Sequence, residues 1–180
     1  MSMRYEAEPS GCGNHFDLEQ LIGSALKRAG QRAAAAESLT GGAISSRLSA
    51  IEGASDWFLG AVVAYGEEVK FTLLGVDRGP VINGSTAAQM AAGVARLLGA
   101  EVAVVTTGVG GPGPQEGRDQ GTVFVAVRTP DGSDVREYHF DGDPGEIVRL
   151  TTERALEDLA RAVAHSQGWF EDMDLGVGLR

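Results

Sequence analysis

Two uninterrupted apolar runs most constrain how this chain can fold. Residues 59–65 and 102–106 are apolar at nearly every position, which is typical of strands buried on both faces of a sheet. Residues 18–29, 85–98 and 143–165 instead place apolar side chains at the three- and four-residue spacing of amphipathic helices. Strands that alternate with helices in this way predict an α/β fold with helices on both faces of the sheet.

Shorter signals complete the predicted sheet. Residues 33–36 form a small apolar run that predicts a short buried strand. Residues 122–128 and 135–140 predict a hairpin that turns at residues 130–132, where a Pro-Asp-Gly sequence stands. The hairpin adds antiparallel pairing, so the predicted sheet is mixed.

Favoured capping residues mark where three helices should begin. Asp17 precedes the first helix, and Ser85 is the expected N-cap of a helix whose inner face would include Leu97. Asp143 is the expected N-cap of the last helix, with Pro144 at its first position. These helices would supply the layers that cover the sheet.

The length of 180 residues fits one domain with a substantial core. We expect a leader over residues 1–15, a single domain over residues 16–166 and a tail over residues 167–180. No apolar run reaches the length of a membrane span, and no signal peptide is evident. Cys12 is the single cysteine, which excludes an intrachain disulfide or a thiolate metal cluster. These features predict a soluble, cytoplasmic protein.

The net charge of −10 bears on the class of partner. General nucleic-acid binding needs clustered Lys and Arg to neutralise phosphates, and an anionic membrane surface also attracts basic segments. The charge therefore disfavours both partners. His15, His139 and His165 lack metal-ligand spacing, so we expect neither a metal nor another cofactor.

A hydroxyl-bearing turn follows the short strand at residues 33–36. Ser38 and Thr40 precede Gly41 and Gly42, and a helix-compatible segment follows. A serine between a strand and a helix start is suitably placed for nucleophilic chemistry, because the unpaired N–H groups of the helix can hold an oxyanion. The alternative is that Ser38 or Thr40 only caps the helix, a role that both residue types favour.

The segment from Thr107 to Gln120 is a long Gly/Pro-rich loop after a predicted strand. Residues 108–113 satisfy the pattern GxGxxG, but prolines and another strand follow instead of a helix. This excludes a dinucleotide fingerprint, and no Walker lysine is present. Loops of this length in a compact domain are usually functional or disordered, which favours a ligand-binding loop over a plain connection.

Lysine is scarce in this chain, which has 13 Arg but only Lys27 and Lys70. Tyr65 ends an apolar run, and Lys70 lies one turn into the helix expected over residues 67–74. Ligands bind where the carboxyl ends of parallel strands meet, so Ser38, Tyr65 and Lys70 could lie at one edge of the sheet. A Ser/Lys pair activates a hydroxyl. The alternative is that Lys70 is a surface residue paired with Glu67.

Several separated blocks together resemble the CinA C-terminal domain family, which includes nicotinamide-nucleotide amidohydrolases. The resemblance covers about residues 18–163. The blocks that carry it are Ala36-Glu37-Ser38-x-Thr40-Gly41-Gly42, Phe58-Leu59-Gly60-x-Val62-Val63-x-Tyr65 with Lys70 five residues on, Leu74-Gly75-Val76, Thr107-Gly108-Val109-x-Gly111-Pro112, Gly121-Thr122-Val123 and Phe140-x-Gly142-Asp143.

The resemblance implies a three-layer α/β/α sandwich with a mixed, mostly parallel sheet. It implies hydrolysis of the carboxamide of nicotinamide mononucleotide, a pyridine nucleotide, to nicotinate mononucleotide and ammonia. Ser38 matches the family's nucleophile and Lys70 its general base, with Tyr65 a further active-site position. The expected substrate-binding residues are Glu37, Thr40, Gly41, Gly42, Thr107, Gly108, Gly110 and Gly111. The expected oxyanion donors are backbone N–H groups near residues 41–42 or 108–111.

The chain departs from the family pattern at several positions. Gly66-Glu67 stands where Ser-Asn is common, Leu39 replaces the usual cysteine, and Pro144 replaces the usual arginine. Residues 80–85 do not follow the usual Ala-Val-Ser pattern. A carboxylate at residue 67 would repel a substrate phosphate.

These departures motivate a second hypothesis, a catalytically silent ligand-binding or scaffold domain linked to competence or DNA damage. The family often carries a molybdopterin-binding-like domain before this one, and its lack here suggests a stand-alone form.

A homo-oligomer, most simply a dimer, is expected from the resemblance and from four large apolar residues near loops and tail. These are Trp57, Phe58, Trp169 and Phe170.

Overall fold

The structure, a computed structural model, describes residues 18–165. Helices and strands alternate along most of this part of the chain, as the sequence predicts. Asp17, Trp169 and Phe170 lie outside it, as do the expected leader and tail. The elements are α1 (Leu18–Ala29), β1 (Ala33–Glu37), α2 (Ala43–Ser49), β2 (Phe58–Val63), α3 (Glu67–Thr72), α4 (Gly84–Leu98), β3 (Val102–Gly108), β4 (Thr122–Thr129), β5 (Gly132–His139) and α5 (Pro144–His165).

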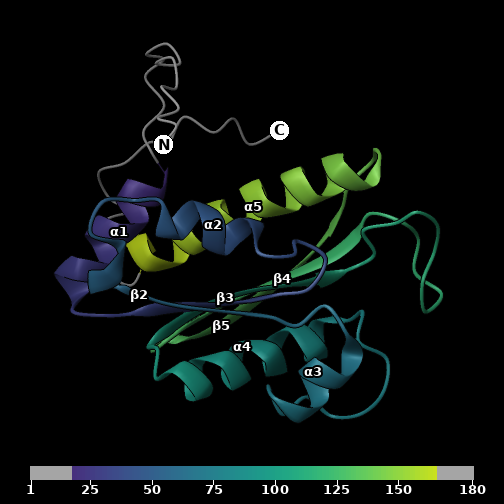
Figure 1. The fold of residues 1–180 in the computed structure, drawn as a ribbon, viewed down its shortest axis with the longest axis horizontal. Coiled ribbons are helices and arrows are strands. Elements are labelled where there is room, and N and C mark those ends of the chain that lie inside the picture. Colours follow the sequence, from purple (N-terminus) through teal and green to yellow (C-terminus); the bar gives the residue numbers. More distant parts are fainter. Residues whose placement is uncertain (1–17, 166–180) are drawn as a thin grey trace, which may run out of the picture.

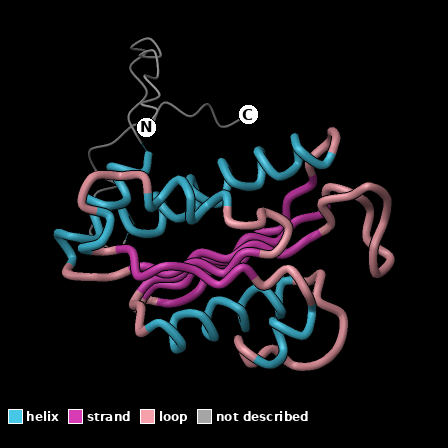
Figure 2. Tube along the Cα trace, in the orientation of Figure 1, coloured by secondary structure: helices cyan, strands magenta, loops and turns pink. Residues whose placement is uncertain are grey.

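The described elements form three layers, which confirms the predicted α/β/α sandwich. Helices α1, α2 and α5 cover one face of the sheet, and α3 and α4 cover the other (Figure 1). The same layers are plain in the trace of Figure 2, where a long loop between β3 and β4 extends beyond the sheet.

The sheet has the strand order β2-β1-β3-β4-β5. Strand β1 pairs in parallel with β2 and β3, while the pairs β3–β4 and β4–β5 are antiparallel. Parallel and antiparallel pairings are therefore equal in number, whereas the sequence prediction had a mostly parallel sheet. The difference arises because β3 pairs with β1 on one side and, in antiparallel orientation, with β4 of the hairpin on the other.

Strand β2 corrects the prediction that residues 59–65 are buried on both faces. It ends at Val63 and lies at the edge of the sheet, where Leu59 and Val63 are 36% and 47% exposed. An apolar run indicates a strand but does not say whether a second neighbour will cover it. Trp57, just before the strand, is 1% exposed, so it does not support the predicted dimer, which stays a prediction.

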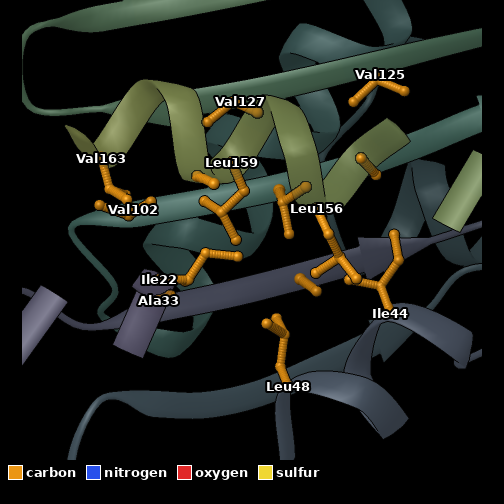
Figure 3. Close-up of a cluster of buried hydrophobic side chains, with 14 of the residues drawn as sticks. Ile22, Ala33, Ile44, Leu48, Val102, Val125, Val127, Leu156, Leu159 and Val163 are labelled. Carbon is orange, nitrogen blue, oxygen red and sulfur yellow. The ribbon is translucent and has the colours of Figure 1, made fainter. Parts of the chain in front are cut away.

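The core lies on both faces of the sheet because alternate strand residues point in opposite directions. Ala33 and Ala35 join the cluster beneath α1, α2 and α5, while Ala34 and Ala36 join the cluster above α4. Figure 3 shows the first cluster. Its labelled residues are Ile22 of α1, Ile44 and Leu48 of α2, Leu156, Leu159 and Val163 of α5, and the strand residues Ala33, Val102, Val125 and Val127.

Two details of α4 differ from the sequence prediction. The N-cap is Asn83, whose side chain accepts a hydrogen bond from the N–H of Thr86 at 2.8 Å, and Ser85 lies inside the first turn. Leu97 is 45% exposed and so does not belong to the inner face. Asp143 does cap α5, because its carboxylate accepts a bond from the N–H of Glu146 at 2.9 Å. None of the helices in the described part is long and apolar enough to cross a membrane.

Candidate active site

The carboxyl ends of β1, β2 and β3 meet at one edge of the sheet because these strands are parallel. Glu37 at the end of β1 lies opposite Val63 of β2 and Thr106 of β3. A cavity of about 170 Å³ opens there. Its lining includes seven of the residues that the sequence assigns to the site, namely Ser38, Tyr65, Lys70, Thr107, Gly108, Gly110 and Gly111.

Ser38 directly follows β1 and is 8% exposed. Its backbone N–H donates to the carbonyl of Thr106 at 3.1 Å, which continues the parallel pairing for one more residue and fixes the backbone. Helix α2 begins at Ala43. Its N-cap is Gly42, which has no side chain to accept a hydrogen bond from the first turn. In the described part of the chain, neither Ser38 nor Thr40 accepts a hydrogen bond from the start of α2 through its hydroxyl, and that of Thr40 lies against Thr106 instead. The alternative in which either residue only caps this helix is therefore wrong, and Ser38 lines the cavity.

Glu37 caps the helix in their place. Its carboxylate accepts hydrogen bonds from the N–H groups of Gly42, Ile44 and Ser45 at 3.0, 3.1 and 2.8 Å, and from the Ser45 hydroxyl. A negative charge at a helix N-terminus is favourable because the unpaired N–H groups there carry positive partial charge. Glu37 is 0% exposed and does not line the cavity, so it fixes the turn that carries Ser38.

The predicted residues Thr40, Gly41 and Gly42 also lie outside the cavity lining. The Thr40 hydroxyl is 2.8 Å from that of Thr106, which ties the turn to β3. The N–H of Gly41 donates to the carbonyl of Ser38 at 3.1 Å, and that of Gly42 donates to Glu37. Both N–H groups are thus already engaged with acceptors of the chain itself.

Lys70 lies in α3 with an exposed fraction of 2%. Its Nζ donates to the carbonyls of Ala64 and Tyr65 at 2.7 and 3.4 Å, so the surface alternative is wrong. Burial lowers the pKa of Lys70 from its ordinary value, because desolvation disfavours the ammonium form. The carboxylates of Glu67 and Glu116 raise this pKa and oppose the effect of burial.

Tyr65 and Glu67 line the cavity on either side of the turn into α3. The Tyr65 side chain is 73% exposed, and its carbonyl is one of the two that hold Lys70. Its catalytic role stays a prediction. Pro144, at the first position of α5, lines the cavity as well. Leu39 lines the cavity too, as do Val81 and Ile82 from residues 80–85, so all four departures from the family pattern lie at the site.

Three glycines of the Gly/Pro-rich loop, Gly108, Gly110 and Gly111, line the cavity and bring backbone close to it. A Cβ atom on Gly108 would lie 2.5 Å from the carbonyl oxygen of Thr122, so only glycine fits there. A Cβ on Gly110 would lie 3.5 Å from that of Leu39, which places the loop against the residue after Ser38. Within residues 18–165, the N–H groups of Leu39, Gly110 and Gly111 donate no hydrogen bond. These three N–H groups are therefore not committed to another acceptor in this part of the chain.

Seven lining residues are not among those that the sequence assigned to the site, namely Leu39, Glu67, Val81, Ile82, Gln115, Pro144 and Val148. The Thr107 hydroxyl donates to the carbonyl of Val81 at 3.0 Å, so β3 and the segment before α4 are joined at the cavity wall. Two signals could have drawn attention to Val81 and Ile82. They stand as an apolar pair in an otherwise irregular stretch, and residues 80–85 depart from the family pattern.

Comparison with known proteins agrees with this architecture. Residues 15–163 match the CinA C-terminal domain family. A putative competence-damage inducible protein of Desulforamulus reducens is 42% identical over 145 residues, and a CinA-like protein of Frankia casuarinae is 40% identical over 157 residues. These matches cover 78% and 84% of this chain but 35% and 36% of the relatives, so the chain spans little more than a third of their length.

Solved structures give the same result. A competence-damaged protein (CinA) superfamily protein from Enterobacter cloacae aligns with a TM-score of 0.80 at 27% identity, covering 90% of this chain and 99% of that one. The competence/damage inducible protein CihA from Agrobacterium tumefaciens aligns with a TM-score of 0.74 at 29% identity, covering 88% and 99%. Together with the family match over most of the domain, these likenesses show that the chain belongs to the CinA C-terminal domain family.

Proposed function

We propose that this chain is a Ser/Lys amidohydrolase that converts nicotinamide mononucleotide to nicotinate mononucleotide and ammonia. One observation carries the proposal, namely that Ser38 and the buried Lys70 line the same cavity. A buried amine that loses its proton readily is suited to act as a base, and a hydroxyl in the same cavity is suited to attack a carbonyl. The family resemblance supports the choice of substrate.

In the proposed reaction, neutral Lys70 accepts the proton of the Ser38 hydroxyl as Oγ attacks the amide carbon. The tetrahedral intermediate collapses, the C–N bond breaks, and protonated Lys70 delivers the proton to the leaving nitrogen, which departs as ammonia. Water then attacks the acyl-enzyme with Lys70 again as base, releasing the carboxylic acid and restoring Ser38. The carbonyls of Ala64 and Tyr65 orient the amine throughout.

The negative charge of the intermediate requires donors that are free in the resting site. The N–H groups of Leu39, Gly110 and Gly111 meet this requirement within the described residues, since none of them is committed to another acceptor. A single donor of this kind contributes about 3–4 kcal/mol to transition-state stabilisation in a well-studied protease. The glycine loop therefore has a chemical role in the proposal through its backbone.

The proposal is tested by ammonia release from nicotinamide mononucleotide in the presence of a chelator, with nicotinate mononucleotide measured by chromatography. We expect turnover that the chelator does not affect, and its loss in Ser38→Ala. The exposed Ser46 on α2 provides the matched control, because Ser46→Ala alters a hydroxyl outside the cavity and should retain full activity. Chelator-sensitive turnover, or an active Ser38→Ala protein, would contradict the mechanism.

One observation favours a second candidate, a domain that binds a ligand without turning it over. Glu67 lines the cavity and raises the pKa of Lys70, which disfavours the neutral amine. Calorimetry with nicotinamide mononucleotide would distinguish the candidates. Binding with no ammonia released over several hours would favour the silent domain, whereas release at a steady rate would favour the enzyme.

A further inference from the structure

Glu116 occupies a backbone conformation that its residue type rarely adopts. Gln115 and Arg118 exchange two backbone hydrogen bonds of 3.0 and 2.9 Å, so residues 115–118 form a tight turn. The central residues Glu116 and Gly117 have φ values of +51° and +72°. Positive φ at both central positions is the pattern of a type I′ turn, which favours Asn, Asp or Gly at the first of them. Glutamate there costs conformational energy, which points to a use for its side chain.

The Glu116 carboxylate reaches across to the segment before α4. It accepts hydrogen bonds from the N–H of Val81 at 2.9 and 3.1 Å and from the N–H of Ile82 at 3.0 Å. Hydrogen bonds to a charged acceptor are stronger than neutral ones. Because the Thr107 hydroxyl holds the carbonyl of Val81, this short segment is fixed from both sides.

We propose that Glu116 is a positioning residue of the Ser38/Lys70 site, because it clamps the cavity wall formed by Val81 and Ile82. The proposal rests on the proposed function for its catalytic consequence. The clamp joins the tip of the long loop to Val81 and Ile82, which line the same cavity as Ser38 and Lys70. Loop and wall then hold a substrate between them in one fixed geometry.

Glu116 also acts on Lys70 through its charge. The charged groups that affect the pKa of Lys70 are Glu67 on α3 and Glu116 in the loop, and both raise it against the effect of burial. Loss of the Glu116 charge should therefore lower the pKa of Lys70. Charge and clamp can be separated by two substitutions, since Glu116→Gln removes the charge but keeps an oxygen at the same reach, whereas Glu116→Asn removes both.

Amide hydrogen exchange tests the clamp directly. In Glu116→Asn, we expect the N–H groups of Val81 and Ile82 to exchange about ten- to a hundredfold faster, the range that corresponds to losing a charge-assisted hydrogen bond. Glu116→Gln should change them far less, because a single oxygen of Glu116 accepts from both N–H groups. Asparagine suits the turn, so Glu116→Asn should stay folded. The matched control is Glu68→Gln, which alters an exposed carboxylate paired with Arg78.

The chain's two lysines make the charge effect measurable by NMR of labelled lysine side chains. Lys27 is exposed and paired with Asp56, so it provides an internal reference for Lys70. Both neutral variants should lower the pKa of Lys70, which moves the acid limb of kcat/KM to lower pH. Only Glu116→Asn should also lower the plateau of kcat/KM, by tenfold or more, because misplacement of a binding wall reduces rate strongly.

The proposal would be overturned if the N–H groups of Val81 and Ile82 exchanged hydrogen at the wild-type rate in Glu116→Asn. It would also be overturned if kcat/KM reached the wild-type plateau in that variant. A wild-type protein that releases no ammonia would instead count against the amidohydrolase. Exchange and the Lys70 titration would then still decide whether Glu116 clamps the cavity wall.

Discussion

Glu37 offers the sharpest test of how the fold positions Ser38. Its carboxylate is 0% exposed and accepts three backbone N–H groups at the start of α2. In Glu37→Ala, the N–H of the fully buried Ile44 loses its partner, which costs about 1.5–3 kcal/mol for a bond to a charged group. The N–H groups of Gly42 and Ser45 are half-buried and regain water, so each adds a smaller loss. Loss of the charge at the helix N-terminus adds about 0.3–1 kcal/mol.

These contributions predict that Glu37→Ala lowers the free energy of unfolding by about 3–5 kcal/mol. Urea denaturation at pH 7, monitored by far-ultraviolet circular dichroism, would measure this loss of stability. Glu68→Ala is the matched control, because an exposed ion pair contributes at most about 1 kcal/mol. Under conditions where Glu37→Ala stays folded, its kcat/KM should fall by tenfold or more, since the turn carrying Ser38 is no longer fixed. A loss below about 1 kcal/mol in Glu37→Ala would refute this reasoning.

Two further predictions concern pH and packing. Burial lowers the pKa of Lys70 in the folded state, so between that pKa and about 10.4 the unfolded chain binds more protons and the free energy of unfolding rises with pH. Lys70→Met should remove this rise. Urea titrations from pH 6 to 10 measure the free energy of unfolding, and the same slope against pH in the wild-type and Lys70→Met proteins would contradict the prediction. Gly108→Ala should lower the melting temperature by several degrees, because its Cβ would lie 2.5 Å from the carbonyl oxygen of Thr122. Calorimetry of this variant beside Gly66→Ala isolates the clash, because Gly66 has a φ of −78° and its Cβ would meet nothing within 4 Å.

Much of the candidate site could be predicted from sequence because its residues lie in short stretches that can be recognised without the fold. Ser38 lies between a strand and a glycine turn, and Lys70 stands out among arginines. The parallel register of β1 with β2 and β3 then brings them to one edge, as the general rule for such sheets anticipates. The periodic helices α1, α4 and α5 were predictable for the same reason, since each carries a long amphipathic pattern.

What could not be predicted depends on tertiary contacts. Glu37 has the sequence context of a substrate-binding acid, and only the path of α2 shows that its carboxylate caps that helix. Glu116 resembles any solvated loop glutamate until its positive φ and its bonds to Val81 are known. Asn83 and Ser85 are both good caps two residues apart, and the backbone decides between them.

The proposed mechanism depends above all on Lys70 as the base that activates Ser38, and a single comparison of rates decides whether it is. The rate to compare is the steady-state rate of ammonia release from nicotinamide mononucleotide by Lys70→Arg beside the wild-type protein. Arginine keeps the positive charge but has no accessible neutral form. We therefore expect kcat to fall by about 10²–10⁴-fold or more, with circular dichroism and ligand affinity close to wild type. A Lys70→Arg protein that retains most of its activity would contradict the mechanism.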